Sequence, residues 1–343
     1  MKQSMFSFLQ SHWISTSVVG GAIWLFGLRI YYWLKPALPL RLRLMVRRWL
    51  ARRQLATCGE QWPILEIAKE APKDWPGWPD GKQFAFVLTH DVESRRGLNR
   101  VKALAEAEMA AGFRSSFNFI PEGPYQVPPE LRQWLVEHGF EVGVHDHRHD
   151  GSLYKSRSHF LVSAARINHF LHDWCAVGFR AGFMFHNLEW HKELNVRYDS
   201  STFDTDPFEP QPEGVKTIFP FWVPGQDGEG YVELPYTLVQ DSTLFVMLQK
   251  RSNEIWKRKL EWIAKNRGMA LLIVHPDYVS FNGRQALGEY PLKHYTEFLD
   301  WVKQTYDGKY WHKLPREIAA CSHPSPPHNA TPTWSAGATA ACA

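Results

Sequence analysis

Residues 84–93 read Phe-Ala-Phe-Val-Leu-Thr-His-Asp-Val-Glu, an apolar run that ends in chemically reactive side chains. An apolar run of this length favours a strand that is buried on both of its faces. Similar short runs recur downstream, and helix-like stretches separate them. This alternation predicts an α/β fold in which helices cover a parallel sheet or barrel.

The expected elements have recognisable boundaries, such as Pro129 at the start of one helix and Gly112 at the end of another. The predicted helices are 98–111, 129–138, 158–174, 253–266 and 292–306. The predicted strands are 84–89, 115–120, 140–144, 177–180, 244–248 and 269–274.

Reactive side chains follow strand after strand in this reading. His90 and Asp91 follow the first strand, and His145 follows the third. Arg180 ends the fourth, and His275 comes directly after the 269–274 run. Because the carboxyl ends of parallel strands meet at one edge, we expect these side chains to share a site there.

The spacing of the histidines and carboxylates predicts a metal centre. His145 and His149 lie four residues apart with His147 between them, and neutral imidazoles suit zinc and similar divalent ions. Asp91 and Glu93 point the same way if the chain is extended. One carboxylate and two imidazoles leave a position for water, and the second carboxylate is then a base. The alternative is a polar loop with solvated histidines.

Five short motifs of the chain are similar to those of a known family. The chain resembles NodB-type polysaccharide deacetylases (carbohydrate esterase family 4) over about residues 84–315. The motifs that carry this resemblance are 89–93, 145–149, 179–182, 198–201 and 273–275. The resemblance implies a distorted (β/α) barrel with a divalent metal, most often Zn²⁺, that hydrolyses an N-acetyl group.

The resemblance also implies roles for individual residues. Asp91 is the implied base, held in place by Arg180. His275 protonates the leaving amine, and Asp199 steers His275, with Asp204 and Asp206 as competing candidates for that role. The implied catalytic residues are therefore Asp91, His275, Arg180 and Asp199, and the expected metal ligands are Glu93, His145 and His149. His90 and His186 are further candidates for substrate contact, although structural roles fit the sequence equally well.

The first motif departs from the commonest family pattern. Val92 stands where most members have a second, metal-binding Asp, so Glu93 is predicted to supply the third ligand from the next position but one. The proline that is common after the third-motif arginine is missing, and Gly182 stands in that neighbourhood.

The segment before the first strand has a different character. Residues 13–34 are apolar apart from Arg29, and 29–53 carries eight cations and no acid. A spanning or interfacial anchor is expected, with the catalytic domain in the cytoplasm by the positive-inside tendency. A cleaved signal peptide, a helix packed on the domain and a periplasmic location remain alternatives.

We therefore expect a helical segment at 1–55, a deacetylase-like domain at 56–320 and a disordered tail at 321–343. Outside 29–53 the chain is slightly acidic, which argues against a nucleic-acid partner. The favoured function is metal-dependent removal of N-acyl groups from an amino sugar or polysaccharide precursor. The rivals are an amidohydrolase acting on formamide or cyclic amide substrates and an inactive carbohydrate-binding relative.

Overall fold

The computed structural model describes residues 39–59, 62–73, 75–225 and 228–322. The apolar stretch 13–34 and nearly all of the expected tail lie outside these residues, so the expectations for them stay predictions. Among the described residues, no helix combines the length and the apolar character needed to cross a bilayer.

The described elements follow one another as α/β units. The strands of the large sheet are β1 Phe84–Val92, β2 Ser116–Phe119, β3 Glu141–His145, β4 Gly178–Arg180, β5 Tyr198–Asp199, β6 Phe221–Pro224, β7 Gly230–Glu233, β8 Met269–Ile273 and β11 Tyr310–His312. A small second sheet joins β9 Val279–Ser280 and β10 Tyr290–Pro291. The α-helices are α3 Leu40–Thr57, α4 Arg95–Leu98, α5 Val101–Ala111, α6 Pro129–Glu137, α7 Arg157–Asp173, α8 Leu188–His191, α9 Glu254–Lys265, α10 Lys293–Thr305 and α11 Pro315–Ser322. Shorter helical turns are η2 Glu66–Lys69, η3 Pro79–Gly81, η4 Gly182–Met184, η6 Ser242–Met247 and η7 Pro276–Tyr278.

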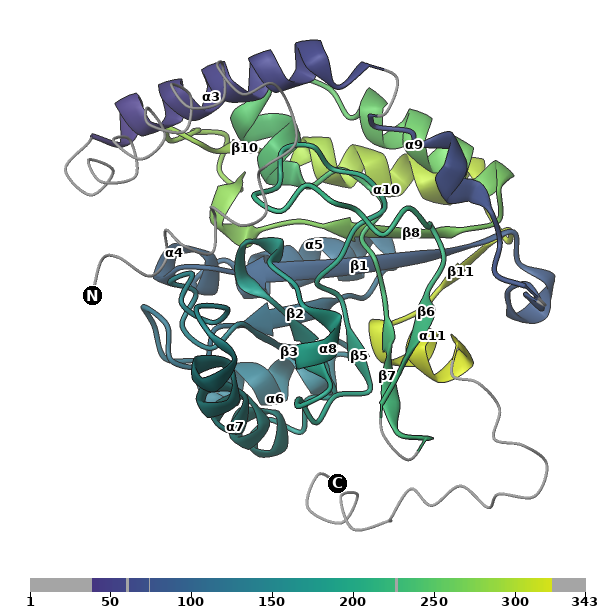
Figure 1. Cartoon of the computed structure of the whole chain (residues 1–343). Helices are drawn as coiled ribbons and strands as arrows, with labels where there is room; N and C mark the ends of the chain where they lie inside the picture. Colours follow the sequence, from purple (N-terminus) through teal and green to yellow (C-terminus); the bar gives the residue numbers. More distant parts are fainter. Residues whose placement is uncertain (1–38, 60–61, 74, 226–227, 323–343) are drawn as a thin grey trace, which may run out of the picture.

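The long strand β1 organises the large sheet. It pairs with β8 on one side, and on the other with β11 and then β2, all in parallel. The sheet continues through β3, β4, β5 and β7 to β6, which runs antiparallel to β7 (Figure 1). Beyond β7, the amides of Thr237 and Leu238 donate to the carbonyl of Leu271 in β8 at 3.1 and 3.0 Å. These bonds bridge the gap between β7 and β8, so the curled sheet is the expected distorted (β/α) barrel.

Successive residues of β1 alternate between two layers, as the pleat of a strand requires. Phe84, Phe86 and Leu88 join the large core under the helices, whereas Ala85 and Val87 pack in the barrel interior. The same alternation places Thr89 and Asp91 on the interior side at the carboxyl end. This is why residues spaced by two reach one site.

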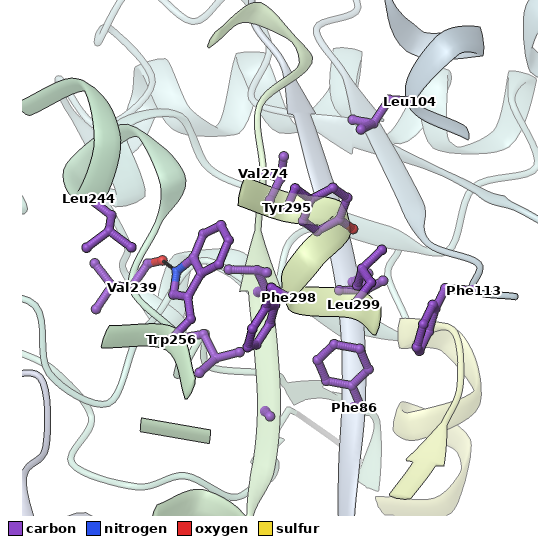
Figure 2. Packing of buried hydrophobic residues seen from close by; sticks show 14 of the residues in the cluster. Phe86, Leu104, Phe113, Val239, Leu244, Trp256, Val274, Tyr295, Phe298 and Leu299 are labelled. Carbon is purple, nitrogen blue, oxygen red and sulfur yellow. Dashed lines mark hydrogen bonds between the residues drawn. The ribbon is translucent and has the colours of Figure 1, made fainter. Parts of the chain in front are cut away.

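The large core lies between the sheet and helices α5, α9 and α10. Figure 2 shows Trp256 of α9 and Phe298 of α10 side by side near Phe86 of β1. The ring centroids of Trp256 and Phe298 lie 5.2 Å apart, and Trp256 Nε1 donates to the carbonyl of Val239 at 2.6 Å. One side chain thus supplies both apolar packing and a satisfied polar group.

Most expected elements match the structure within one to three residues, but the strand expected at 244–248 is wrong. This segment is the π-helical turn η6, whose residues Leu244 and Phe245 are buried in the large core. Asp241 caps it by accepting a hydrogen bond from the amide of Ser242 at 2.7 Å. A short apolar run does not distinguish a strand from a buried helical turn, whereas an acid at the start of the run favours the helical turn.

We expect Trp256→Ala to lower the free energy of unfolding by about 3–5 kcal/mol, because it leaves a large cavity and an unpaired carbonyl. Trp49→Ala is the matched control, since Trp49 is 53% exposed and its loss should cost within about 0.5 kcal/mol. Urea unfolding followed by circular dichroism measures both. Equal costs would contradict the placement of Trp256 in the core.

Candidate metal centre

The HxxxH segment reaches the site through a tight turn, not a helix. His145 ends β3, and both Asp146 and His149 adopt positive φ angles of 59° and 54°. This left-handed backbone folds the chain back, so the rings of His145 and His149 lie 4.9 Å apart between centroids. Such backbone strain is typical of sites where geometry matters more than local stability.

Three side chains present a set of donor atoms. The ligating atoms of Glu93, His145 and His149 all lie within 4.8 Å of one another. Both histidines are largely buried, yet within the described structure no hydrogen-bond partner satisfies either Nε2 atom. Glu93 Oε1 lies 3.4 Å from Nε2 of His149, an electrostatic contact without hydrogen-bond geometry.

The tautomer of His145 is fixed by its surroundings. Its Nδ1 lies 3.1 Å from the carbonyl oxygen of Arg180, and a carbonyl only accepts, so Nδ1 carries a proton. Burial, the largest effect, lowers the pKa of His145 and favours the neutral ring. The lone pair on Nε2 is therefore free for a cation. Two imidazoles and a carboxylate fit a divalent metal of the zinc type, with Glu93, His145 and His149 as holders.

Glu93 is held both at its carboxylate and at its backbone. Oε2 accepts a hydrogen bond from the Tyr278 hydroxyl at 3.0 Å, and the backbone amide of Glu93 donates to Asp277 Oδ2 at 3.0 Å. Asp277 also accepts from the Ser94 hydroxyl, which fixes the loop after β1. Burial raises the pKa of Glu93, but His149, His275 and His145 together lower it, so the carboxylate is ionised.

Asp91 lies beside this set in a buried position. Its Oδ1 accepts from Asn118 Nδ2 at 3.0 Å and from Arg180 Nη1 at 3.1 Å. Burial raises its pKa, yet Arg180 and then the nearby histidines reverse this and bring the pKa to about 2. Asp91 is thus kept as a carboxylate, the form that accepts a proton.

Arg180 is fully buried, and all of its nitrogen atoms are used. Nη1 also donates to Thr89 Oγ1 at 2.8 Å, while Nε and Nη2 donate to the carbonyl and hydroxyl of Ser200 at 2.7 and 2.6 Å. A buried guanidinium is costly unless its nitrogen atoms have partners, and here each of the three nitrogen atoms has at least one. The structure thus brings Arg180 and Asp91 into contact, and the role of Asp91 as a base stays a prediction.

His275 lies near Glu93 and has its own carboxylate partner, Asp241. Its Nδ1 lies 2.6 Å from Asp241 Oδ1, and its backbone amide donates to Asp241 Oδ2 at 2.9 Å. Its Nε2 points to the site and lies 3.8 Å from Glu93 Oε1. Burial lowers the pKa of His275, but Asp241 and then Glu93 and Asp91 raise it to about 10. A cation bound beside Glu93 would oppose this rise.

The expectation that Asp199 steers His275 is wrong, because Asp241 takes that position. Asp199 Oδ2 lies 2.6 Å from Nδ1 of His191, and Oδ1 accepts from the Ser201 hydroxyl at 2.5 Å. These groups form a buried polar cluster behind the site. Asp241 was missed because it precedes a segment read as a strand, although an acid before an apolar turn is a typical helix cap.

The remaining candidate histidines do not join the metal centre. His147 turns to Glu122, whose Oε2 lies 3.0 Å from its Nε2. His90 points to the helix side of β1, where it is fully buried and its Nε2 lies 2.8 Å from Glu108 Oε1. His186 contacts the carbonyl of Met184 at 3.0 Å. A structural role fits His90 and His147.

Gly182 allows the turn after Arg180 to pack against the HxxxH turn. A Cβ atom at this position would lie 2.4 Å from Asp146 Oδ2 and 2.8 Å from Cδ2 of His149. The two turns therefore approach more closely than any other residue type would permit. This gives a physical reason for glycine in the region where a proline was expected.

Comparison with known proteins supports the fold. The structure matches a candidate polysaccharide deacetylase from Mycobacterium smegmatis with a TM-score of 0.57 at 19% identity, over 76% of this chain and 99% of that one. A peptidoglycan deacetylase from Bacillus subtilis matches at 0.42 and 12% identity, over 71% and 92%. A family 4 carbohydrate esterase from Streptomyces lividans matches at 0.39 and 12% identity, over 66% and 90%.

No family model and no curated protein matches the sequence. The fold assignment rests on the mycobacterial structure alone, because the two weaker matches add no argument. The chain thus shares the fold of a candidate polysaccharide deacetylase, in agreement with the NodB-type motifs.

We expect Glu93→Ala to weaken zinc binding by about 100-fold or more, since even outer partners of metal ligands contribute about 10–100-fold. Competition with a chromophoric chelator measures the affinity. Glu122→Ala is the matched control, because Glu122 contacts His147 and two arginines outside the donor set and should leave the affinity unchanged. Full zinc content in Glu93→Ala would refute the assignment of this ligand.

Proposed function

We propose that this chain is a divalent-metal-dependent hydrolase that removes an N-acyl group from an amino sugar or a polysaccharide precursor. The observation that carries the proposal is the convergence of ligand atoms at the carboxyl end of the sheet. Glu93, His145 and His149 offer their ligand atoms within 4.8 Å of one another, with the ionised Asp91 and the His275 ring adjacent. We favour zinc because imidazole and carboxylate ligands suit it.

Hydrolysis of an amide needs an activated water, a base and an acid. A bound divalent metal lowers the pKa of water and polarises a carbonyl. Asp91 has the position and charge to take the proton, and Arg180 keeps it ionised. His275, with Nδ1 held by Asp241, presents Nε2 to donate a proton to the departing amine nitrogen.

The surroundings of the metal centre fit a sugar. Phe183 stacks on His149 with ring centroids 4.4 Å apart, and 38% of its surface is exposed. An exposed aromatic ring next to the reacting groups offers a flat apolar face to a pyranose ring. This supports an amino sugar more than a small formamide or cyclic amide.

The proposal extends to the cellular setting. The cations at 29–53 follow the apolar stretch 13–28, which favours a membrane-associated enzyme with its catalytic domain in the cytoplasm. An enzyme in this location would meet lipid-linked or nucleotide-linked sugar precursors. A reporter fused after residue 343 tests the orientation, and periplasmic activity would refute it.

Zinc-loaded protein is expected to release acetate from N-acetylated amino sugars, and removal of the metal with a chelator is expected to abolish turnover until zinc is restored. Coupled detection of acetate measures the rate. Opening of cyclic amides in place of acetate release would favour the related amidohydrolase. No turnover on any acylated amine would identify an inactive relative.

We expect Asp241→Asn to lower kcat by roughly 10²–10⁴-fold with little change in KM, because His275 loses the carboxylate that orients and charges it. Asp199→Asn is the matched control, since both acids are buried partners of a histidine but Asp199 contacts His191. Its kcat should stay within about threefold. A similar fall in both variants would contradict the assignment of Asp241.

A further inference from the structure

Helix α3 lies on the outside of the barrel, on the same side of the sheet as α9 and α10 (Figure 1). Its inner face carries Leu44 and Ala51, which are buried against the domain. Arg48 Nε donates to the carbonyl of Val246 at 3.0 Å, and Arg52 Nη2 donates to Gln249 Oε1 at 2.9 Å. The helix is thus fixed to η6 and the residues that follow it.

The outer face of α3 is not the polar surface that a covering helix normally shows. On this face Met45 and Trp49, one turn apart, are 60% and 53% exposed, and Leu40 at the first turn of the helix is 50% exposed. Nine large apolar side chains are exposed in the described part of the chain, and these three belong to one helix, with Leu287 on a neighbouring loop as a fourth. Apolar side chains gathered in this way mark an interaction surface.

A cationic cavity of about 750 Å³ lies between α3 and the start of α10. Its cationic lining residues are Arg41, Arg48, Lys250, Arg251 and Lys293. Glu289 is the acid in the lining, and its carboxylate already pairs with Arg100 at 2.6 Å and Arg96 at 3.4 Å. Among the described residues, the five lining cations form no ion pair, so the cavity carries uncompensated positive charge.

We infer that the outer face of α3 and this cavity together form a docking surface for an anionic phospholipid bilayer. Met45 and Trp49 would enter the interfacial region, while the lining cations would receive phosphate groups of the lipid. Charge complementarity favours lipid over a second copy of this chain, because two such cationic surfaces repel each other. In the sequence, the uncharged apolar stretch 13–28 precedes α3.

The full chain tests this surface by co-sedimentation with vesicles of phosphatidylcholine, alone or mixed with phosphatidylglycerol. The variant Lys250→Glu/Arg251→Glu/Lys293→Glu reverses three exposed cations of the cavity. The ratio of binding to anionic and neutral vesicles should fall by on the order of 100-fold, because each basic residue near the membrane contributes about 1 kcal/mol. Any binding of residues 1–38 to neutral lipid contributes equally with the anionic and the neutral vesicles, so it cancels in this ratio.

The matched charge control reverses three exposed lysines elsewhere, Lys155→Glu/Lys265→Glu/Lys309→Glu, and should keep the wild-type ratio. An equal fall in the control would overturn the inference, because net charge would then explain the effect. A second outcome would also overturn the inference. If the cavity variant loses affinity for inorganic pyrophosphate but keeps the wild-type vesicle ratio, the cavity binds a soluble anion.

A second pair of variants tests the apolar half of the surface. Met45→Ser/Trp49→Ser should weaken binding to both kinds of vesicle by roughly tenfold or more, since partial burial of two large side chains is lost. Leu161→Ser/Val162→Ser removes two exposed apolar side chains of α7 and should have no effect. Equal binding by the two variants would refute the role of α3. Turnover of a soluble acylated amine, measured in parallel, separates this outcome from any failure of the proposed activity.

Discussion

The buried guanidinium of Arg180 is the constraint on which the site depends. Its side chain holds Asp91 as a carboxylate, and its own carbonyl accepts hydrogen bonds from the ring of His145 and the amide of Asp146. One residue at the end of β4 therefore positions the proposed base, a candidate metal ligand and the turn between the two histidines. A charge buried in this way is costly, so its full set of hydrogen bonds has to be kept.

Further buried polar pairs join the helices to the rest of the domain. His90 of β1 pairs with Glu108 of α5, and Lys259 of α9 pairs with Asp204 at 2.9 Å. Burial raises the pKa of Asp204 to about 6 in spite of Lys259, because the ionised carboxylate loses its hydration at this position. Such pairs add little net stability, but they favour one arrangement of helices over others because a slipped helix would leave a charge alone.

The sequence predicts those site residues that follow the alternation of a strand or lie directly at its end. Asp91 and Glu93 continue the interior face of β1, and His145 and His275 end or directly follow apolar runs. Asp241 could not be predicted in this way, because its partner His275 lies 34 residues away and Asp241 precedes a π-helical turn that has no strand periodicity. The short strands β5, β6, β7 and β11 escaped because two to four residues carry too little periodicity.

The turn η6 joins two regions that the sequence keeps apart. Asp241 at its start positions His275, and its last residues contact Arg47 and Arg48 of α3. A shortened chain that begins after Thr57 would lose the contacts of α3 with Val246 and Met247, in the same turn whose first residues position His275. The unit that keeps η6 covered on both sides therefore includes α3, and an insertion between this helix and the barrel would preserve that packing only if the helix could still reach η6.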